Sequence, residues 1–569
     1  MYFEQFYLGC LAHASYMLGS EGEAAVVDPQ RDVELYLTAA AEKGLKIRHI
    51  FETHLHADFV SGHVELARRT GATIYIGARA SAEFPHVPLS DGFELQMGKV
   101  RIAAVETPGH TPESCCLVIT SLEAGESAKS ETDSSGKELP KSPKLHPSKP
   151  TSGLPGTPLP KIAKSERQDL TTDPRQAGTG DTDHTDHRNA GDDVRAASMG
   201  GEKPWAVLTG DTLFIGDVGR PDLSPGFSSQ QLAGMLYDSL HSKLLTLPDD
   251  VLVYPAHGAG SLCGRNMRAD RFSTIGTERM TNYALQIKGR DEFIEQMTAN
   301  LPARPEYFFQ DAQINRQGAA PLGDLPPLKA IPAAELKRLL SEDPNGTKAE
   351  AVFAVDVRPI TEFAEAHVPR SINIALSGQF ATWAASVLGL KASPVLIADT
   401  PQQYEKARVR MARVGIEDVR GYLEGGLAAW KQAGFALEKL PQITAQELQQ
   451  SLSEGQYAVT GLTRTEGDIP SQAGTRKTLR VLDVRREPEW QAGHIAGAAW
   501  WPLDRFKVSP PEVDPEAPLA VHCASGYRSV IACSLLRRAG MQNVINVVGG
   551  FDAWKKAGLE VEKAEPVSA

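Results

Sequence analysis

The segment Thr53-His54-Leu55-His56-Ala57-Asp58-Phe59 constrains the fold of this chain more than any other. It follows an apolar run, Ile47 to Phe51, which reads as a buried strand. Two histidines and an aspartate at alternating positions after a strand direct several metal-ligand side chains at one point. Imidazoles and a carboxylate suit zinc, iron or manganese. We therefore expect a metal centre at a strand end, the alternative being a simple pair of surface histidines.

Three further loops of the same kind follow in order: Gly109-His110-Thr111, Thr209-Gly210-Asp211 and Pro255-Ala256-His257-Gly258. Each lies near the end of a strand-like run, namely Cys115–Thr120, Ala206–Leu208 or Val251–Tyr254. Four ligand-bearing loops in this order resemble the metallo-β-lactamase superfamily. The resemblance implies an αββα sandwich.

Length and charge narrow the function classes. A chain of 569 residues predicts several domains, and a net charge of −12 without a basic stripe argues against nucleic-acid binding. No apolar run reaches eighteen residues, and the amino terminus lacks the pattern of a signal peptide, so we expect no membrane association. Six cysteines are too few for a disulfide framework, which favours reduced thiols and a cytoplasmic location. The sequence leaves a homo-oligomer open.

The segment from Glu123 to Lys203 has a different composition from the rest of the chain. Ser, Thr, Pro, Gly, Lys and Asp dominate it, so it cannot bury enough surface to offset its ordering entropy. We expect a disordered insertion between two runs that would otherwise pair as neighbouring strands. A metal role for its histidines is the weaker alternative to solvated loop positions; they are His146, His184 and His187.

Beyond the Pro- and Gly-rich stretch Pro321–Pro327 the chain repeats itself. An Asp-Val-Arg element is followed by a histidine eleven residues after its aspartate in both copies, which pair Asp356 with His367 and Asp483 with His494. Short apolar strands alternate with helical stretches, which predicts two α/β domains with parallel sheets. The two units resemble rhodanese domains, in which the Asp and Arg brace the sheet. The predicted domains are 1–301, 328–440 and 441–569.

The second unit contains Val521-His522-Cys523-Ala524-Ser525-Gly526-Tyr527-Arg528-Ser529 between an apolar strand and a helix expected at Val530–Arg538. Backbone N–H groups and the positive helix end favour a thiolate at such a cysteine, and Arg528 adds a positive charge. We expect Cys523 to carry a persulfide, with Ser525 and Gly526 in contact with the substrate. A buried, inert cysteine is the alternative. In the rhodanese-like class, the six residues from Cys523 to Arg528 match sulfurtransferases rather than phosphatases.

The first unit departs from this pattern. A gap-free comparison sets Asp399 against Cys523, Gln402 against Gly526 and Tyr404 against Arg528. No nucleophilic sulfur and no cationic loop remain, so we expect this unit to be inactive in sulfur transfer.

The region from Tyr2 to Leu301 resembles the persulfide dioxygenases. The shared motifs are Thr-His-x-His-Ala-Asp, Thr-Pro-Gly-His-Thr, Thr-Gly-Asp with a downstream Gly-Arg-Pro-Asp, and Tyr-Pro-Ala-His. Two-metal zinc hydrolases of this fold, such as glyoxalase II, have a histidine where Phe59 stands. The resemblance therefore implies one iron(II) per chain, held by His54, His110 and Asp211. His56, Asp58 and His257 would orient the ligands or line the pocket.

The resemblances imply the oxidation of a thiol persulfide by O₂ to sulfite, and sulfur transfer among persulfide, sulfite and thiosulfate. Arg220 and Cys263 are candidates for substrate contact, with an ion pair and simple packing as their alternatives. The thiol carrier is left open between glutathione, coenzyme A and another small thiol. Two alternative functions remain: a zinc-dependent thioester hydrolase fused to a sulfurtransferase, and a non-catalytic sensor of sulfane sulfur.

Overall fold

The computed structural model describes residues 1–122, 203–342, 352–454, 478–507, 511, 513–515 and 517–563. The insertion expected at Glu123 to Lys203, with its three histidines, lies outside the described residues except for Lys203. Its flanks are strands β9 (Cys115–Ser121) and β10 (Ala206–Gly210), which pair antiparallel. The two runs that the insertion separates are therefore neighbouring strands, as expected.

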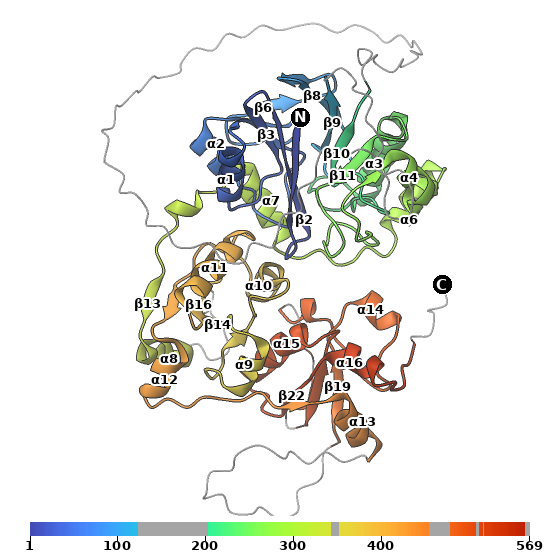
Figure 1. The fold of residues 1–569 in the computed structure, drawn as a ribbon. Coiled ribbons are helices and arrows are strands. Elements are labelled where there is room, and N and C mark those ends of the chain that lie inside the picture. The colour runs from blue at the N-terminus through green and yellow to red at the C-terminus, as the bar shows by residue number, and fades with distance from the viewer. Residues whose placement is uncertain are drawn as a thin grey trace, which may run out of the picture. The chain divides into compact units, whose positions relative to one another are not determined.

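Two six-stranded sheets form the N-terminal half, in the orders β1-β2-β3-β4-β5-β6 and β12-β11-β10-β9-β8-β7. Figure 1 shows α1 and α2 beside the first sheet and α3, α4 and α6 beside the second, so the αββα sandwich is confirmed. The first sheet comprises β1 (Tyr2–Leu8), β2 (His13–Ser20), β3 (Glu23–Val27), β4 (Lys46–Glu52), β5 (Thr73–Gly77) and β6 (Val87–Leu89). The second sheet comprises β9 and β10 together with β7 (Glu94–Met97), β8 (Val100–Glu106), β11 (Leu252–Pro255) and β12 (Ser273–Thr274). The helices are α1 (Glu34–Glu42), α2 (His63–Thr70), α3 (Ser229–Ser242), α4 (Ile275–Thr281), α5 (Tyr283–Gln286), α6 (Arg290–Thr298) and α7 (Phe308–Gln317).

Apolar side chains fill the space between the two sheets. Phe51 and Tyr75 from the first sheet meet Leu117 and Leu208 from the second in one buried cluster. A separate cluster fills the space between the first sheet and its helices and includes Tyr36 of α1. Burial on both faces explains why the central strands are nearly continuous apolar runs. This packing fixes the strand ends from which the polar loops emerge.

Each C-terminal unit has a five-stranded parallel sheet, in the orders β13-β17-β16-β14-β15 and β18-β22-β21-β19-β20. The first unit comprises β13 (Lys329–Ile331), α8 (Ala333–Glu342), β14 (Ala354–Asp356), α9 (Ile360–Glu365), β15 (Ile372–Asn373), α10 (Phe380–Leu388), β16 (Val395–Ile397), α11 (Pro401–Ala412), β17 (Gly421–Leu423) and α12 (Gly426–Gln432). The second comprises β18 (Gln442–Ile443), α13 (Ala445–Ser453), β19 (Arg480–Asp483), α14 (Glu487–Gln491), β20 (Ala499–Trp500), β21 (Leu519–His522), α15 (Tyr527–Arg538), β22 (Val544–Val547) and α16 (Gly550–Lys556). The helix expected at Val530 thus begins three residues earlier, directly after Gly526, because Gly526 adopts a positive φ and turns the chain into the helix.

The Asp-Val-Arg elements are braces of these sheets. Arg358 forms an ion pair with Asp356 at 2.6 Å and donates to the carbonyl of Ala366. In the second unit Arg485 pairs with Asp483 at 2.5 Å and donates to the carbonyl of Gly493. Each buried carboxylate is thereby neutralised by a guanidinium. The same guanidinium donates a hydrogen bond to the residue before the repeated histidine, which is His367 or His494.

Outside the insertion the chain packs as one compact unit. The first rhodanese-like unit contacts the sandwich through an ion pair between Arg413 and Asp32 at 2.7 Å and another between Arg31 and Glu417 at 2.6 Å. The amide of Val60 also donates to the carbonyl of Arg413 at 2.7 Å. The loop that begins at His54 is therefore held in part by the end of α11.

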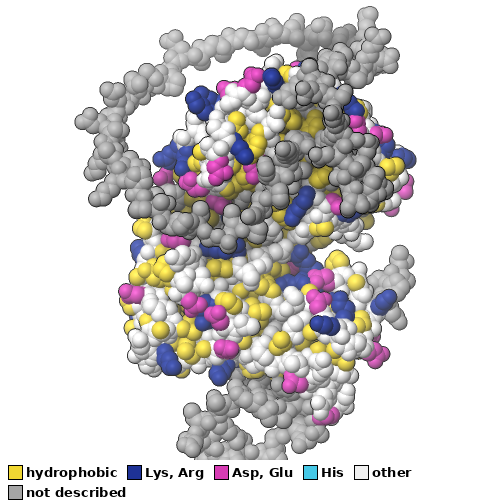
Figure 2. Space-filling model, in the orientation of Figure 1, with side chains coloured by type: hydrophobic (Ala, Val, Ile, Leu, Met, Phe, Trp, Pro, Cys, Tyr) yellow, Lys and Arg dark blue, Asp and Glu magenta, His cyan; other side chains and the backbone are white. Residues whose placement is uncertain are grey.

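Surface charge is mixed on the face that Figure 2 shows. The described Lys and Arg side chains there are interspersed with Asp, Glu and apolar side chains, and they do not merge into one basic stripe. Within the described ranges, no helix has the length and apolar character needed to cross a membrane.

Asn315 of α7 fixes the loop after β4. Its amide nitrogen donates to the carbonyls of His56 at 2.8 Å and Phe59 at 2.7 Å, and its carbonyl oxygen accepts from the amide of Ser61 at 2.8 Å. Asn315 is only 1% exposed, so water cannot replace it. One side chain thus satisfies three backbone groups of the metal-ligand loop.

We predict that Asn315→Ala destabilises the N-terminal domain by about 2–4 kcal/mol, because buried backbone groups would lose their partners. Calorimetry should show a lower melting temperature for this domain. Gln313→Ala, an exposed change on the same helix, is the control and should change stability by less than about 0.5 kcal/mol. Equal melting temperatures for the two variants would contradict the clamping role.

Candidate functional site

Four polar loops converge where the two sheets of the sandwich meet. His54 follows β4 of the first sheet, whereas Asp211 and His257 follow β10 and β11 of the second. His110 lies in the loop between β8 and β9. All four side chains are buried. The packed sheets therefore bring together residues that lie far apart in the sequence.

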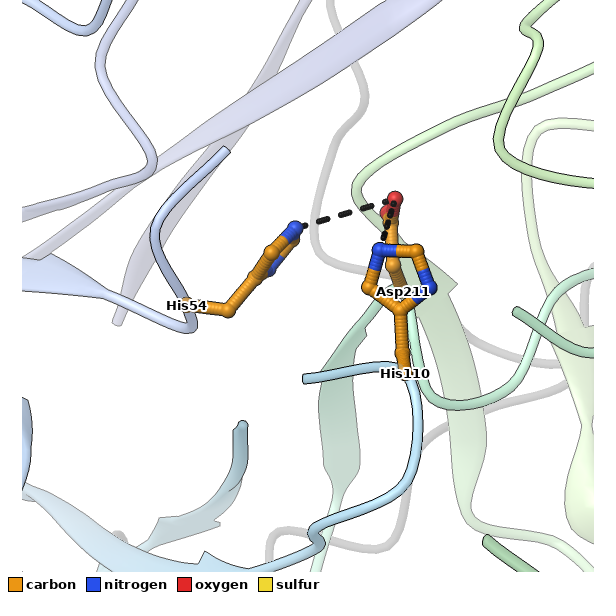
Figure 3. Close-up of side chains that lie close together, drawn as sticks. All are labelled: His54, His110 and Asp211. Atoms are coloured by element: carbon orange, nitrogen blue, oxygen red, sulfur yellow. Dashed lines mark ion pairs between the residues drawn. The ribbon is translucent and has the colours of Figure 1, made fainter. Parts of the chain in front are cut away.

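His54, His110 and Asp211 form one buried group with metal-ligand chemistry. Figure 3 shows both imidazoles directed at the Asp211 carboxylate. His54 Nε2 lies 3.7 Å and His110 Nε2 lies 3.5 Å from Asp211 Oδ2. The three potential ligand atoms lie within 4.8 Å of one another. One ion could contact all three without a large backbone movement.

The far nitrogen of each imidazole is held by a hydrogen bond. Thr53 Oγ1 donates to Asp28 Oδ2 at 2.9 Å, so it can accept from His54 Nδ1 at 3.0 Å. His110 Nδ1 donates to the carbonyl of Arg220 at 3.0 Å. With the proton on Nδ1 in both rings, both Nε2 atoms present lone pairs to the centre.

The charge state of the group also suits a cation. Burial and neighbouring His56 hold the pKa of His54 well below its usual value, and burial lowers the pKa of His110. Burial acts to raise the pKa of Asp211, but His257 and the other imidazoles outweigh it and hold that pKa well below its usual range. Two neutral imidazoles and a carboxylate are the forms that bind a divalent metal.

His257, Asp58 and His56 form a second buried group beside the first. His257 Nδ1 donates to Asp211 Oδ1 at 2.7 Å, and His257 Nε2 lies 3.0 Å from Asp58 Oδ2. Burial disfavours the imidazolium, but Asp211 and Asp58 raise the pKa of His257 well above its usual value. His257 thus links the two carboxylates. The ligand atoms of His56, Asp58 and His257 also lie within 4.8 Å of one another.

Phe59 packs against two histidines beside this group. Its buried ring lies 4.4 Å from that of His56 and 4.1 Å from that of His13, between ring centroids. A phenyl ring offers no lone pair, so this position contributes packing and not coordination.

Sequence reasoning missed three buried polar residues around the site: His13, Asp28 and Glu52. His13 is fully buried, its ring centroid lies 5.4 Å from that of His257, and neither of its nitrogens has a hydrogen-bond partner. Asp28 accepts hydrogen bonds from the backbone amide and from the hydroxyl of Thr53, and Glu52 accepts one from Ser61 Oγ at 2.6 Å. Asp28 directly follows β3 and Glu52 is the last residue of β4, and a carboxylate at a strand end is a sequence signal that could have identified both. His13 is the first residue of β2, and the sequence around it contains no such signal.

The two substrate candidates near the metal group occupy different surroundings. Cys263 is buried, and its sulfur lies within 4.8 Å of ligand atoms of Asp211 and His257. Burial, Asp58 and Asp211 raise the pKa of this thiol well above its usual value, so it is neutral. Arg220 instead pairs with Asp222 at 2.7 Å and donates to the carbonyls of Leu262 and Pro302. These contacts fit the ion-pair alternative for Arg220, and its contact with a substrate stays a prediction.

A second centre surrounds Cys523, between β21 and α15. The amide of Gly526 donates to Cys523 Sγ at 3.2 Å, and the thiol contacts Ser529 Oγ at 3.6 Å. Gly526 has φ +105°, which turns its amide toward the sulfur. A β-carbon on Gly550 would lie 2.3 Å from the carbonyl oxygen of Cys523, so only glycine allows α16 to approach this loop. Ser525, in contrast, is exposed at the tip of the loop.

Arg528 does not face the sulfur as a free cation. Its guanidinium binds both carboxylate oxygens of Glu489, at 2.6 and 2.7 Å. Part of its charge is neutralised by that pair. The hydrogen bond to Cys523 Sγ comes from the loop backbone, and Arg528 contributes a field at longer range.

The first unit closes the equivalent loop with a helix cap. Thr400 caps α11, and Gln403 Oε1 accepts from the amides of Asp399 at 2.9 Å and Thr400 at 3.0 Å. The hydroxyl of Tyr404 donates to the carbonyl of Ala398. The loop is therefore closed by internal hydrogen bonds, and the sequence of this unit contains no cysteine.

Comparisons with known proteins agree with this architecture. A profile of the metallo-β-lactamase superfamily matches residues 8–123, and a profile of the rhodanese-like domain matches residues 332–433 and 470–557. Persulfide dioxygenase ETHE1 of Bos taurus is 24% identical over 296 residues, which covers 51% of this chain and 77% of that protein. Hydroxyacylglutathione hydrolase of Anaeromyxobacter dehalogenans is 38% identical over 104 residues, 18% of this chain and 40% of that enzyme.

The match to the hydrolase therefore spans less than half of that enzyme's length. Among solved structures, a metallo-β-lactamase from Staphylococcus aureus is 26% identical with a TM-score of 0.53, covering 74% of this chain and 99% of that one. The profiles, the two facing sheets and the paired parallel sheets lead to one assignment. The N-terminal domain therefore matches the metallo-β-lactamase superfamily in profile and in fold, and two rhodanese-like domains follow it.

Proposed function

We propose that this protein is a bifunctional enzyme of sulfide oxidation. Its N-terminal domain would oxidise a low-molecular-weight thiol persulfide to sulfite, and its last domain would transfer sulfur among persulfide, sulfite and thiosulfate. The observation that carries the first activity is the buried group His54, His110 and Asp211. Likeness to persulfide dioxygenases and the rhodanese-like domains support the link to sulfur metabolism.

The metal group fits one iron(II) per chain. Two imidazoles and one carboxylate on one side leave the other positions of an octahedral ion for substrate and O₂. Iron(II), when bound, would supply the binding and reduction of O₂. The balanced reaction is RSSH + O₂ + H₂O → RSH + SO₃²⁻ + 2H⁺. The chain's own residues hold the ligands in their neutral or ionised forms and exclude bulk water from the site.

The groups beside the metal define the rest of the pocket. Cys263, a neutral thiol next to Asp211 and His257, would contact the sulfur end of the substrate. The carrier thiol would be glutathione, coenzyme A or a similar small thiol. All six cysteines are free, which supports a reducing compartment such as the cytoplasm.

Sulfur transfer would take place at Cys523. A persulfide on this residue has its inner sulfur next to the amide of Gly526, which stabilises the thiolate that leaves. Sulfite attacks the outer sulfur, so that a new S–S bond forms while the Cys523 Sγ–S bond breaks. The balanced step is Cys–S–S⁻ + SO₃²⁻ → Cys–S⁻ + S₂O₃²⁻. The first rhodanese-like unit, with its capped loop, would take no part in this chemistry.

A zinc-dependent thioester hydrolase fused to a sulfurtransferase is the second candidate. The likeness to hydroxyacylglutathione hydrolase favours it. Phe59 argues against it, because a two-metal hydrolase needs a ligand at that position. Metal content and oxygen uptake distinguish the two functions.

We predict that His54→Ala, His110→Ala and Asp211→Ala each lower iron affinity and persulfide-dependent oxygen uptake by roughly 100-fold or more, since each removes a direct ligand. Metal analysis of anaerobically purified protein and an oxygen electrode measure the two effects. The wild type should bind about one iron per chain.

The control is His86→Ala, which removes a partly exposed histidine that bonds the carbonyl of Phe84 away from the metal group. It should keep its iron and its oxygen uptake. Two tightly bound zinc ions per wild-type chain, with thioester hydrolysis and no oxygen uptake, would establish the hydrolase instead.

We predict that Cys523→Ser abolishes sulfur transfer from thiosulfate to a thiol and leaves oxygen uptake largely intact. With persulfide under air, the wild type should release sulfite and thiosulfate, whereas the variant should release mainly sulfite. Product speciation at equal persulfide consumption measures this shift.

Cys533→Ala is the matched control, because Cys533 is buried inside α15 among apolar side chains. It should keep the wild-type ratio of sulfite to thiosulfate. If Cys523→Ser retains sulfur transfer, the nucleophile lies elsewhere, and Cys263 would be tested next.

A further inference from the structure

A third buried group of ligand-type side chains adjoins the loop that contains His54. It consists of Asp28, Glu52 and His56, each at most 1% exposed. Asp28 directly follows β3, Glu52 is the last residue of β4, and His56 lies in the loop after β4. One ligand atom from each of the three lies within 4.8 Å of the others. Two strand ends and the metal-ligand loop therefore place an imidazole beside two carboxylates.

The His56 imidazole lies close to both carboxylates but is hydrogen-bonded to neither. Its Nε2 atom lies 3.2 Å from Asp28 Oδ1 and 3.9 Å from Glu52 Oε2. Within the described part of the chain, neither nitrogen of this ring has a hydrogen-bond partner. Ligand atoms of a tetrahedral zinc ion lie roughly 3.4 Å apart, given metal–ligand distances of about 2.1 Å. The spacing around this nitrogen is therefore that of a metal site.

The two carboxylates need a compensating positive charge. Asp28 accepts from the amide and the hydroxyl of Thr53, and Glu52 accepts from Ser61 Oγ, but these donors are neutral. Among the described residues, no Lys or Arg forms an ion pair with either carboxylate. Two buried carboxylates this close repel each other unless a cation lies between them. A divalent ion would neutralise both.

Glu52 uses its two oxygens differently. Oε1 accepts from Ser61 Oγ at 2.6 Å and lies 3.4 Å from Nδ1 of His63, the first residue of α2. Oε2 is the oxygen that lies nearer to His56 Nε2. Ser61 and His63 thus orient the carboxylate from one side, as groups around a metal ligand do, and leave Oε2 for an ion.

The donor set and the burial favour zinc over other divalent ions. Magnesium and calcium prefer high coordination numbers built from oxygen, and magnesium usually retains several waters. A buried group of three side chains with one imidazole does not offer that shell. Zinc binds imidazole nitrogen together with carboxylate oxygen in a tetrahedral shell, which one water molecule would complete here.

We propose that Asp28, Glu52 and His56 bind a structural zinc ion, in addition to the metal at His54, His110 and Asp211. The ion would tie the ends of β3 and β4 to the metal-ligand loop and stabilise the folded domain. Since the group is enclosed, the ion would not contact a substrate. The proposal does not depend on the reaction proposed above, because its test measures metal content and position instead of turnover.

The experiment separates this ion from the first metal group. Full-length His110→Ala protein, in which the first group lacks a ligand, is equilibrated with buffered Zn²⁺. Mass spectrometry measures zinc per chain, and anomalous diffraction at the zinc edge locates zinc in crystals of this variant and of the zinc-loaded wild type. We expect about one zinc per His110→Ala chain. Both crystals should show a peak between Asp28, Glu52 and His56.

Glu52→Gln, added to the His110→Ala background, keeps the size of the side chain and removes its charge. It should lower zinc affinity at least tenfold. Glu113→Gln in the same background is the matched control, because Glu113 is also buried and accepts from the amide of Leu55 in the same loop. Among the described residues it belongs to no metal-ligand group. It should keep its zinc, and a chelator should lower the melting temperature of this control but not that of Glu52→Gln.

Three results would overturn the proposal. A zinc-loaded wild type without an anomalous peak at this position would leave the two carboxylates to share a proton instead. That measurement needs no variant, so it decides the question even if Glu52→Gln does not fold. Equal zinc affinity of Glu52→Gln and Glu113→Gln would exclude Glu52 as a ligand. A peak between His56, Asp58 and His257, with none at Asp28, would place the ion in the neighbouring group.

Discussion

The burial of the Asp211 carboxylate is the constraint on which the rest of the N-terminal domain depends. An ionised carboxylate removed from water is costly unless cations or donors surround it. Here His257 donates to it, and the Nε2 atoms of His54 and His110 face it. Those imidazoles are held in turn by Thr53 and by the carbonyl of Arg220. These partners offset the free-energy cost of burying the carboxylate only while their loops keep these positions. A bound divalent cation would offset that cost further.

The middle domain stabilises this arrangement although it contains no cysteine of its own. The carbonyl of Arg413 binds the metal-ligand loop at Val60, and Arg413 pairs with Asp32. Gln379 reaches Gly260 on the other side of the pocket. A domain without a nucleophile can therefore influence the metal centre through ordinary backbone and side-chain contacts. Its apolar core is continuous with that of the last domain, because α15 packs against β15.

Sequence patterns predicted the fold well because strand ends, paired motifs and apolar runs are local features. The αββα sandwich, the two parallel sheets and the pairing of β9 with β10 all follow from such runs. The charge partners did not follow, because they depend on side chains far apart in sequence. Arg220 pairs with Asp222 and donates to two carbonyls, and Arg528 pairs with Glu489. His13 reaches the site only through the pairing of its strand with the loop at His257.

The capping of α11 gives the middle domain a loop unlike its counterpart in the last domain. Gln403 Oε1 accepts from the amides of Asp399 and Thr400, the positions aligned with Cys523 and Ala524. A cysteine introduced at position 399 would have Gln402 in place of Gly526 and Tyr404 in place of Arg528. Rebuilding a sulfur loop there would therefore require several substitutions and would disturb the cap of α11.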